Sequence, residues 1–156
     1  TEASWQREIA QKLCDMGVDA IIGGHPHVIE PVDVFTSEDG THKTFCAFSL
    51  GNQLSNQRRE MMRLKTGNTE DGLFIDLEIT RNKKGDVSLT GVKYIPTWVY
   101  KNASGPTYSI VPVDDPSTVE EKTGIKGIQA QAQASYDRTY KIIGDGVNKV
   151  SEAYGF

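Results

Sequence analysis

Apolar and polar positions repeat with different periods along the chain, and these periods divide it into predicted helices and strands. Residues 4 to 16 carry apolar side chains at helical intervals, and Gly17 stands where a left-handed helix end is expected. We therefore predict an amphipathic helix that packs on a sheet. Residues 18 to 22 are predicted to form a short buried strand, which leads into a glycine loop. In α/β sheets, ligand sites collect at the carboxyl ends of strands, where this loop lies.

A predicted hairpin follows the loop. Residues 28 to 35 and 43 to 50 are rich in β-forming residues, and a polar connector with an Asp-Gly pair joins them. Antiparallel pairing would bring Gly51 and Asn52 back beside the start of the first strand. Alternating apolar residues predict a second hairpin and two further extended pieces, at residues 72 to 80, 87 to 94, 96 to 100 and 108 to 113.

The remaining segments show weaker patterns. Residues 53 to 71 are polar without a clear period, so we expect a long surface loop, either a lid beside a site or a disordered segment. Ser117 and Glu120 have the spacing of a capping box at the start of the last helical region. The best helical pattern there covers residues 128 to 143 and is expected to end at Gly144.

Composition limits the class of protein. The 156 residues can bury one ordinary core, and 24% of them are charged and 37% hydrophobic. The apolar stretches fall short of the roughly 20 residues that span a bilayer. A net charge of −4 argues against nucleic acid as the main partner. The two cysteines, Cys14 and Cys46, are expected to be buried free thiols.

The glycine loop carries the strongest candidate chemistry. The strand ends in Gly23 and Gly24, and His25 and His27 follow on either side of Pro26. Imidazole binds first-row metal ions through one neutral ring nitrogen, while the other nitrogen can be held by a hydrogen-bond acceptor. A His-x-His pair alone is weak, so a tight turn with solvated histidines remains the competing interpretation.

Other polar residues have competing interpretations too. Arg58 and Arg59 could hold phosphate or carboxylate groups through forked hydrogen bonds, although a run of charges in a loop is more often solvated. His42, in the polar connector, is expected to be exposed to solvent. Glu30 and Asp33 flank the glycine loop that carries His25 and His27, which is called the histidine loop below. For both acidic residues, salt bridges or solvation are favoured over support of a metal ligand.

Several ordered stretches resemble the bacterial capsule biosynthesis protein CapA family. They are residues 17 to 28, 30 to 32 and 48 to 52, together with residues 94 to 99. The resemblance implies a role in poly-γ-glutamate capsule synthesis and a calcineurin-like metallophosphoesterase fold. On this basis the fold class is α/β (α+β), the carboxyl-terminal portion of a layered α/β/β/α sandwich with mixed and antiparallel strands. Residues 1–113 would belong to that domain, and residues 114–156 would form a helical segment packed on it.

The resemblance also implies a site. His25 and His27 become the catalytic residues and ligands of two divalent ions such as Mn, Fe or Zn, with the other ligands in an upstream part of the protein. Asn52, Arg58 and Arg59 become substrate-binding candidates, with a purely structural turn as the alternative for Asn52. This chain has Gly23 and Gln53 where the family often has a histidine and an aromatic residue, which puts substrate contacts in doubt.

The function expected from the resemblance is phosphoester hydrolysis by the full-length protein, with this chain alone inactive and binding metal weakly. The alternative is a non-catalytic component that binds polyglutamate or a glycan in a cell-envelope assembly, and a third interpretation is a structural domain with a relic loop. Expected partners are the upstream part of the same protein, polyglutamate or a phosphorylated envelope substrate, and a membrane-associated capsule assembly. The expected location is the extracellular face of the bacterial membrane.

Overall fold

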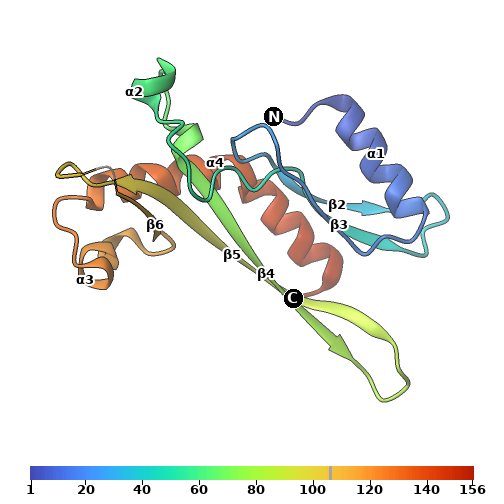
Figure 1. The fold of residues 1–156 in the computed structure, drawn as a ribbon. Helices are drawn as coiled ribbons and strands as arrows, with labels where there is room; N and C mark the ends of the chain where they lie inside the picture. Colours follow the sequence, from blue (N-terminus) through green and yellow to red (C-terminus); the bar gives the residue numbers. More distant parts are fainter. Residues whose placement is uncertain (106) are drawn as a thin grey trace.

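A computed structural model describes residues 1–105 and 107–156, which form helices and two three-stranded sheets (Figure 1). The first half contains α1 (Ser4–Asp15), β1 (Ala20–Ile22), β2 (Val32–Thr36), β3 (Lys43–Ala47), α2 (Arg59–Met62) and the 3-10 turn η1 (Asn68–Glu70). The second half contains β4 (Asp71–Arg81), β5 (Val87–Lys101), β6 (Tyr108–Pro112), the 3-10 turn η2 (Pro116–Thr118), α3 (Val119–Thr123) and α4 (Gln129–Tyr154). One sheet is mixed and the other antiparallel, which confirms the predicted α/β class.

The first sheet has the strand order β1-β3-β2 and contains the predicted hairpin. β2 and β3 pair antiparallel, and a further bridge joins Ile29 to Leu50. β1 lies parallel to β3, with Ile21 opposite Cys46. The prediction of a buried β1 is wrong, since Ile22 is 51% exposed. The reason is that β1 is an edge strand, with no partner on its outer side among the described residues.

α1 packs on this sheet as predicted, but it does so through its small side chains. Ala10 and Cys14 are buried against apolar residues of β2 and β3. The larger apolar residues lie outside the contact, with Trp5 60% and Ile9 48% exposed. Gly17 follows the helix with a φ of 85°, so the predicted left-handed helix end is confirmed.

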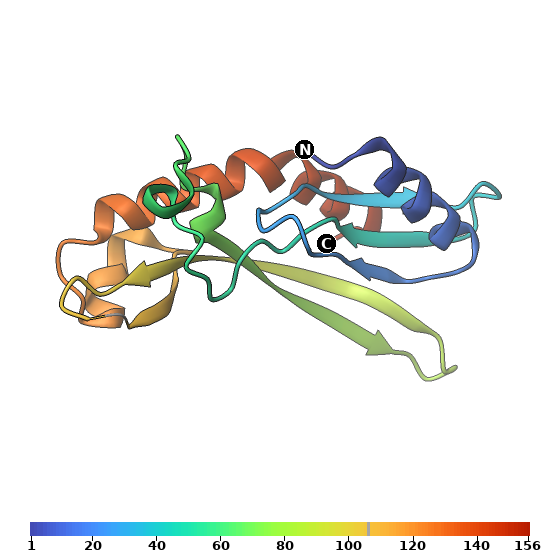
Figure 2. The same ribbon diagram turned by 45° about the horizontal axis from the view of Figure 1, so that its top comes forward.

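The second sheet is antiparallel, with the order β4-β5-β6. β4 and β5 form the second predicted hairpin, which extends from Asp71 opposite Trp98 to Arg81 opposite Val87. β5 continues as one strand to Lys101, where two separate pieces were predicted, and its last residues pair with β6. β5 therefore runs along the whole second sheet (Figure 2).

α4 is longer than predicted. It passes through Gly144 and Gly146 and ends at Tyr154, whereas the low helix propensity of glycine predicted an end at Gly144. A Cβ on Gly146 would lie 1.8 Å from the carbonyl oxygen of Val32. Gly146 is therefore required by the close approach of α4 to β2, and it does not terminate the helix.

The face of the first sheet opposite α1 packs on α4 and on the β4–β5 hairpin (Figures 1 and 2). The buried residues of this core include Val32, Phe45, Leu73 and Ile143. Both cysteines are buried free thiols, as predicted. Because β1 and β3 are parallel, the loops that follow them meet at one end of the sheet.

Residues 53–71 are more ordered than the predicted surface loop. They include α2 and η1, and Thr69, Glu70 and Asp71 are buried. The burial has a physical cause, because the carboxylates of Glu70 and Asp71 pair with arginines.

The predicted capping box at Ser117 and Glu120 is wrong. The side chain of Asp115 accepts the N–H of Ser117 at the start of η2. Glu120 instead accepts the N–H of Ile128 at 3.0 Å, next to the first residue of α4. The glutamate therefore caps the following helix across an intervening turn.

Candidate functional site

β1 leads the chain into the loop that carries both candidate histidines. Gly23 is fixed to the end of β3, because its N–H donates to the carbonyl oxygen of Ala47 at 2.8 Å and its own carbonyl oxygen accepts from Leu50 at 3.3 Å. A Cβ on Gly23 would lie 2.1 Å from the carbonyl oxygen of Phe48. Only glycine fits here unless a strand shifts, so the start of the loop is rigidly defined.

His25 and His27 both have left-handed backbone conformations, with φ values of 98° and 59°. Residues with a Cβ seldom adopt such conformations, and in proteins they are concentrated at functional sites. Both residues are exposed at the carboxyl end of β1. The loop thus presents two imidazoles at the surface in a conformation that the surrounding structure must maintain.

Asn52 contacts this loop through two hydrogen bonds and makes a third to Thr69 of η1. Its Oδ1 lies 2.8 Å from Nδ1 of His27. Its Nδ2 donates to the carbonyl oxygen of His27 at 3.1 Å and to that of Thr69 at 2.9 Å. Asn52 is only 6% exposed. The prediction that closure of the hairpin returns Asn52 to the histidines is confirmed.

The two hairpins together position Asn52. Its N–H donates to the carbonyl oxygen of Asp71 at 3.0 Å, and the N–H of Leu73 donates to the carbonyl oxygen of Leu50 at 2.9 Å. A bridge between Gly51 and Gly72 lies between these bonds. The end of β3 is therefore joined to the start of β4, and Asn52 is buried at the junction.

The donors present are suited to part of a metal centre. Imidazoles bind zinc, manganese and iron, and His27 has one ring nitrogen held by Asn52 and the other available. Among the described residues, however, no group of three or more His, Cys, Asp or Glu side chains is arranged to hold a metal ion. A catalytic zinc usually takes three protein ligands, and a two-metal centre takes more. The described residues can therefore supply some, but not all, of the ligands of such a centre.

Arg58 and Arg59, predicted to bind substrate, both contact the buried carboxylate of Glu70. Glu70 lies 3.1 Å from Nε of Arg59 and 3.5 Å from Nη2 of Arg58. Hydrogen bonding to Glu70 raises the pKa of Arg59. Burial would raise the pKa of Glu70, but the hydrogen bonds from Arg59 and the charge of Arg58 outweigh it and hold that pKa below its usual value. A bound anion would share both guanidinium groups with Glu70.

Glu70 and Asp71 were missed by the sequence analysis. Asp71 accepts hydrogen bonds of 2.7 Å from two nitrogens of Arg138 and another of 2.7 Å from Ser135. The available signal was an acidic pair directly before an alternating strand, in an arginine-rich segment. The backbone around Glu70 connects the histidine loop with the two arginines, because Asn52 donates to the main-chain carbonyl oxygens of the residues on either side of Glu70.

The other flanking residues have structural partners. The prediction that His42 is simply solvated is wrong, because it is half-buried and its Nε2 lies 3.0 Å from the carbonyl oxygen of Val18. Asp33 forms an ion pair with Arg7, which confirms the salt-bridge interpretation. Glu30 accepts a hydrogen bond of 2.9 Å from a side chain of α1.

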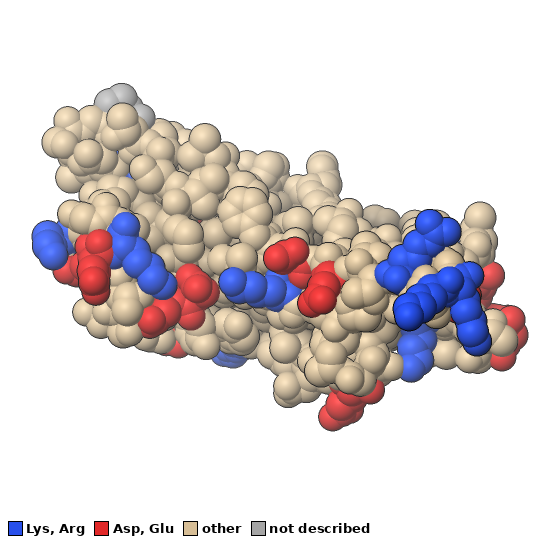
Figure 3. Space-filling model, turned by 90° about the horizontal axis from the view of Figure 1, so that it is seen from below, with Lys and Arg blue, Asp and Glu red and all other residues tan. Residues whose placement is uncertain are grey.

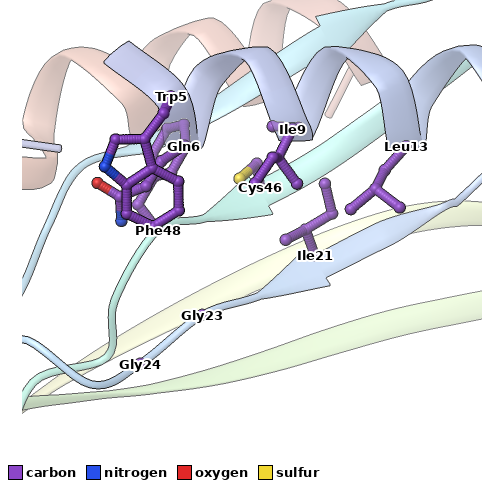
Figure 4. A pocket seen from close by; sticks show the side chains of 10 residues that line it. Trp5, Gln6, Ile9, Leu13, Ile21, Gly23, Gly24, Cys46 and Phe48 are labelled. Atoms are coloured by element: carbon purple, nitrogen blue, oxygen red, sulfur yellow. The ribbon is translucent and has the colours of Figure 1, made fainter. Parts of the chain in front are cut away.

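A small apolar pocket of about 160 Å³ opens beside the glycines of the loop, between α1 and the first sheet (Figure 4). Its wall on the helix side is the apolar face of α1 that the sheet leaves exposed. The lining residues are Trp5, Gln6, Ile9, Ala10, Leu13, Ile21, Gly23, Gly24, Cys46 and Phe48. The pocket suits an apolar group and borders the start of the histidine loop.

Acidic and basic side chains lie side by side over the left and middle of one face of the molecule, and several basic side chains gather toward its right end (Figure 3). Nucleic-acid binding surfaces need a concentrated positive field. With a net charge of −4, the exclusion of nucleic acid as the main partner stays a prediction.

Comparison with known proteins gives two matches. Residues 1–57 match the family model described as bacterial capsule synthesis protein PGA_cap. The PGA biosynthesis protein CapA of Bacillus subtilis (strain 168) is 30% identical over 87 residues. That alignment covers 56% of this chain and 20% of CapA, so the matched part is about a fifth of that relative.

No solved structure resembles the chain significantly. Within residues 1–105 and 107–156, no helix combines the length and the apolar character that crossing a membrane requires.

Proposed function

We propose that this chain, whose residues 1–57 match the bacterial capsule synthesis family PGA_cap, supplies two imidazole ligands to a divalent metal centre of a capsule synthesis protein. The main support is the contact between Asn52 and His27, because a buried amide holds one ring nitrogen and leaves the other available. The ions that suit these donors are Mn, Fe and Zn.

The remaining ligands would come from an upstream part of the same protein. Two divalent ions, when bound, supply Lewis acidity for the hydrolysis of a phosphoester. His25 and His27 would hold the metal, and Asn52 would hold His27 in place. Arg58 and Arg59 would orient an anionic substrate, in competition with Glu70. The chain alone would bind metal weakly.

Replacement of His27 tests the catalytic role. In the full-length protein, His27→Ala should reduce phosphoester hydrolysis at least 100-fold, measured with a chromogenic phosphodiester and added manganese or zinc. His42→Ala is the matched control, because His42 bonds to the carbonyl oxygen of Val18, between α1 and β1, and lies outside the proposed centre. It should leave turnover within a few-fold of the unmodified protein. Unchanged turnover of His27→Ala would reject the proposal.

A non-catalytic binding function is the second candidate. Arg58, Arg59 and Lys101 border a cavity of about 340 Å³ together with Trp98 and with the Glu70 carboxylate, which an acidic ligand would have to displace from the arginines. Guanidinium groups bind carboxylates through paired hydrogen bonds, so this cavity suits poly-γ-glutamate or another acidic polymer. In this case, the protein would guide the polymer during capsule assembly without hydrolysis.

Binding of poly-γ-glutamate in excess chelator tests this second function. Persistent binding would favour it, and Arg58→Ala should then weaken binding at least tenfold. Arg63→Ala is the control, since Arg63 is an exposed arginine of the same segment that does not line the cavity. Absence of binding with and without metal would remove this function.

The proposed setting is the extracellular face of the bacterial membrane, in a membrane-associated capsule assembly. The match of residues 1–57 to the capsule synthesis family is its support. Protease treatment of intact cells should digest the protein, whereas full protection until the cells are lysed would reject this location.

A further inference from the structure

We infer that Asn52 is a positioning residue that fixes the tautomer of His27 and so selects Nε2 as its ligand nitrogen. The usefulness of this selection depends on the proposed metal centre. The selection itself does not, because a tautomer exists in the metal-free chain and can be observed there.

The orientation of the Asn52 amide follows from its neighbours. Its Nδ2 faces two carbonyl oxygens, those of His27 and Thr69, at 3.1 and 2.9 Å. Carbonyl oxygens only accept hydrogen bonds, so the NH2 group must be on that side. The opposite orientation would place an amide oxygen against two other oxygens. Oδ1 is therefore the atom that faces the ring of His27.

The orientation of the amide decides the position of the ring proton. Oδ1 only accepts, and it lies 2.8 Å from Nδ1 of His27. A neutral imidazole has one N–H and one unprotonated nitrogen, so the N–H must be at Nδ1. Nε2 is then left with a free lone pair. A metal ion binds through such an unprotonated nitrogen.

His42 provides an opposite case in the same chain. Its Nε2 lies 3.0 Å from the carbonyl oxygen of Val18, so Nε2 must carry the proton there. Two histidines of one protein are thus held in opposite tautomers by two different acceptors. His42 can serve as an internal reference for His27, and its resonances also report whether the first sheet is folded.

Asn52 also supports the backbone of the loop. Its Nδ2 holds the carbonyl oxygen of His27, whose φ of 59° is unfavourable for a residue with a Cβ. The acceptor atom of Asn52 therefore sets the tautomer, and the donor atom helps to hold the backbone. A substitution that keeps only the acceptor can separate these two effects.

Nitrogen NMR of the unmodified chain provides the first test. At about pH 8, where an ordinary imidazole is neutral, long-range proton–nitrogen spectra distinguish protonated from unprotonated ring nitrogens. His27 should show its unprotonated nitrogen at Nε2, and His42 at Nδ1. A proton on Nε2 of His27 would overturn the inference, whatever the variants show.

Two near-isosteric variants provide the second test. Asn52→Asp keeps an acceptor toward Nδ1 and should retain the tautomer of His27, although it loses the donor bonds. Asn52→Leu removes the acceptor, and His27 should then populate the Nε2-protonated form. Asn102→Leu is the control, since Asn102 bonds only within an exposed turn, and it should leave His27 unchanged. A retained tautomer in a folded Asn52→Leu chain would overturn the inference.

Zinc titration then separates this inference from the proposed function. If both hold, Asn52→Leu should weaken zinc binding at His27 about 10- to 100-fold, as loss of a partner to a ligand histidine usually does. If the tautomers are as inferred and zinc perturbs neither His25 nor His27, the metal proposal fails and the tautomer assignment stands.

Discussion

At the scale of single residues, the start of the histidine loop depends on a backbone contact that is too close to leave room for a side chain. The carbonyl oxygen of Phe48 occupies the space where a Cβ of residue 23 would lie. The neighbouring residue, Gly24, has nothing within 4 Å of the corresponding position. Two adjacent glycines therefore have different roles, because only the first is fixed by a strand contact.

Alanine substitutions at these glycines should have different effects. Gly23→Ala should destabilise the chain by about 3 kcal/mol, because overpacking against backbone cannot be relieved by a rotamer change. Gly24→Ala should alter stability by less than about 1 kcal/mol in either direction. Urea unfolding measures both changes in the free energy of unfolding, provided that the m-value is the same for the two variants and the unmodified chain. Equal effects of the two substitutions would show that the end of β1 is not held against β3.

The Glu70 carboxylate should make stability depend on pH. Its folded-state pKa is lowered, so the stabilisation by Arg58 and Arg59 is present above its ordinary pKa of 4.5 and is lost as the pH falls through the folded-state value. At pH 7, Glu70→Gln should lower the free energy of unfolding by about 3 kcal/mol. The difference from the unmodified chain should shrink as the pH falls below 4.5, because the native carboxyl then becomes protonated.

Glu60→Gln is the control for the Glu70 prediction. Glu60 also contacts Arg58, but its side chain is 53% exposed. Its substitution should change stability by less than about 1 kcal/mol. Chemical unfolding at several pH values gives both series, and a Glu70→Gln deficit that stays constant from neutral to acidic pH would contradict the prediction.

At the scale of elements, the contact of α4 with β2 holds the carboxyl-terminal helix to the first sheet. Gly146→Ala should separate them and lower stability by about 3 kcal/mol, since the added Cβ would lie 1.8 Å from the carbonyl oxygen of Val32. Gly144→Ala, in the same helix with nothing within 4 Å, should raise stability by about 0.5–1 kcal/mol. Thermal unfolding of the pair measures both effects, and a stabilising Gly146→Ala would contradict the packing described.

Local sequence patterns predicted the elements that local physics determines. Two runs of β-forming residues and an Asp-Gly connector predicted the β2–β3 hairpin, and its antiparallel closure predicted that Asn52 lies beside His27. The same reasoning ended α4 too early. The helix propensity of Gly146 is a local property, whereas the carbonyl of Val32 that requires a glycine is more than a hundred residues away in sequence.

Distant partners also explain what was missed at the site. Glu70 looked like a loop carboxylate, but its burial depends on arginines that fold back onto it and on Trp98 of β5. His42 looked solvated, but the end of α1 brings Val18 to its ring. In each case the partner is supplied by the fold, and a single sequence gives no local sign of it.

At the scale of the whole molecule, one side of the first sheet remains open. Among the described residues β1 has no strand partner on its outer side, and the exposed side chains of Trp5 and Ile9 lie near Gly23 and Gly24 at the start of the histidine loop (Figure 4). Exposed edges and apolar patches of this kind often mark surfaces where further polypeptide packs. They support the proposal that additional metal ligands come from elsewhere in the protein.

The central claim is that His25 and His27 are two of the ligands of one metal centre. Zinc titration of the metal-free chain, followed by NMR of its three histidines, tests it most directly. His25 and His27 should respond together with one dissociation constant weaker than about 1 μM, because the described residues lack a third ligand. His42 should not respond. The proposal that these two histidines are part of a larger metal centre would be contradicted by separate responses of His25 and His27, by no response from either, or by binding tighter than about 1 μM.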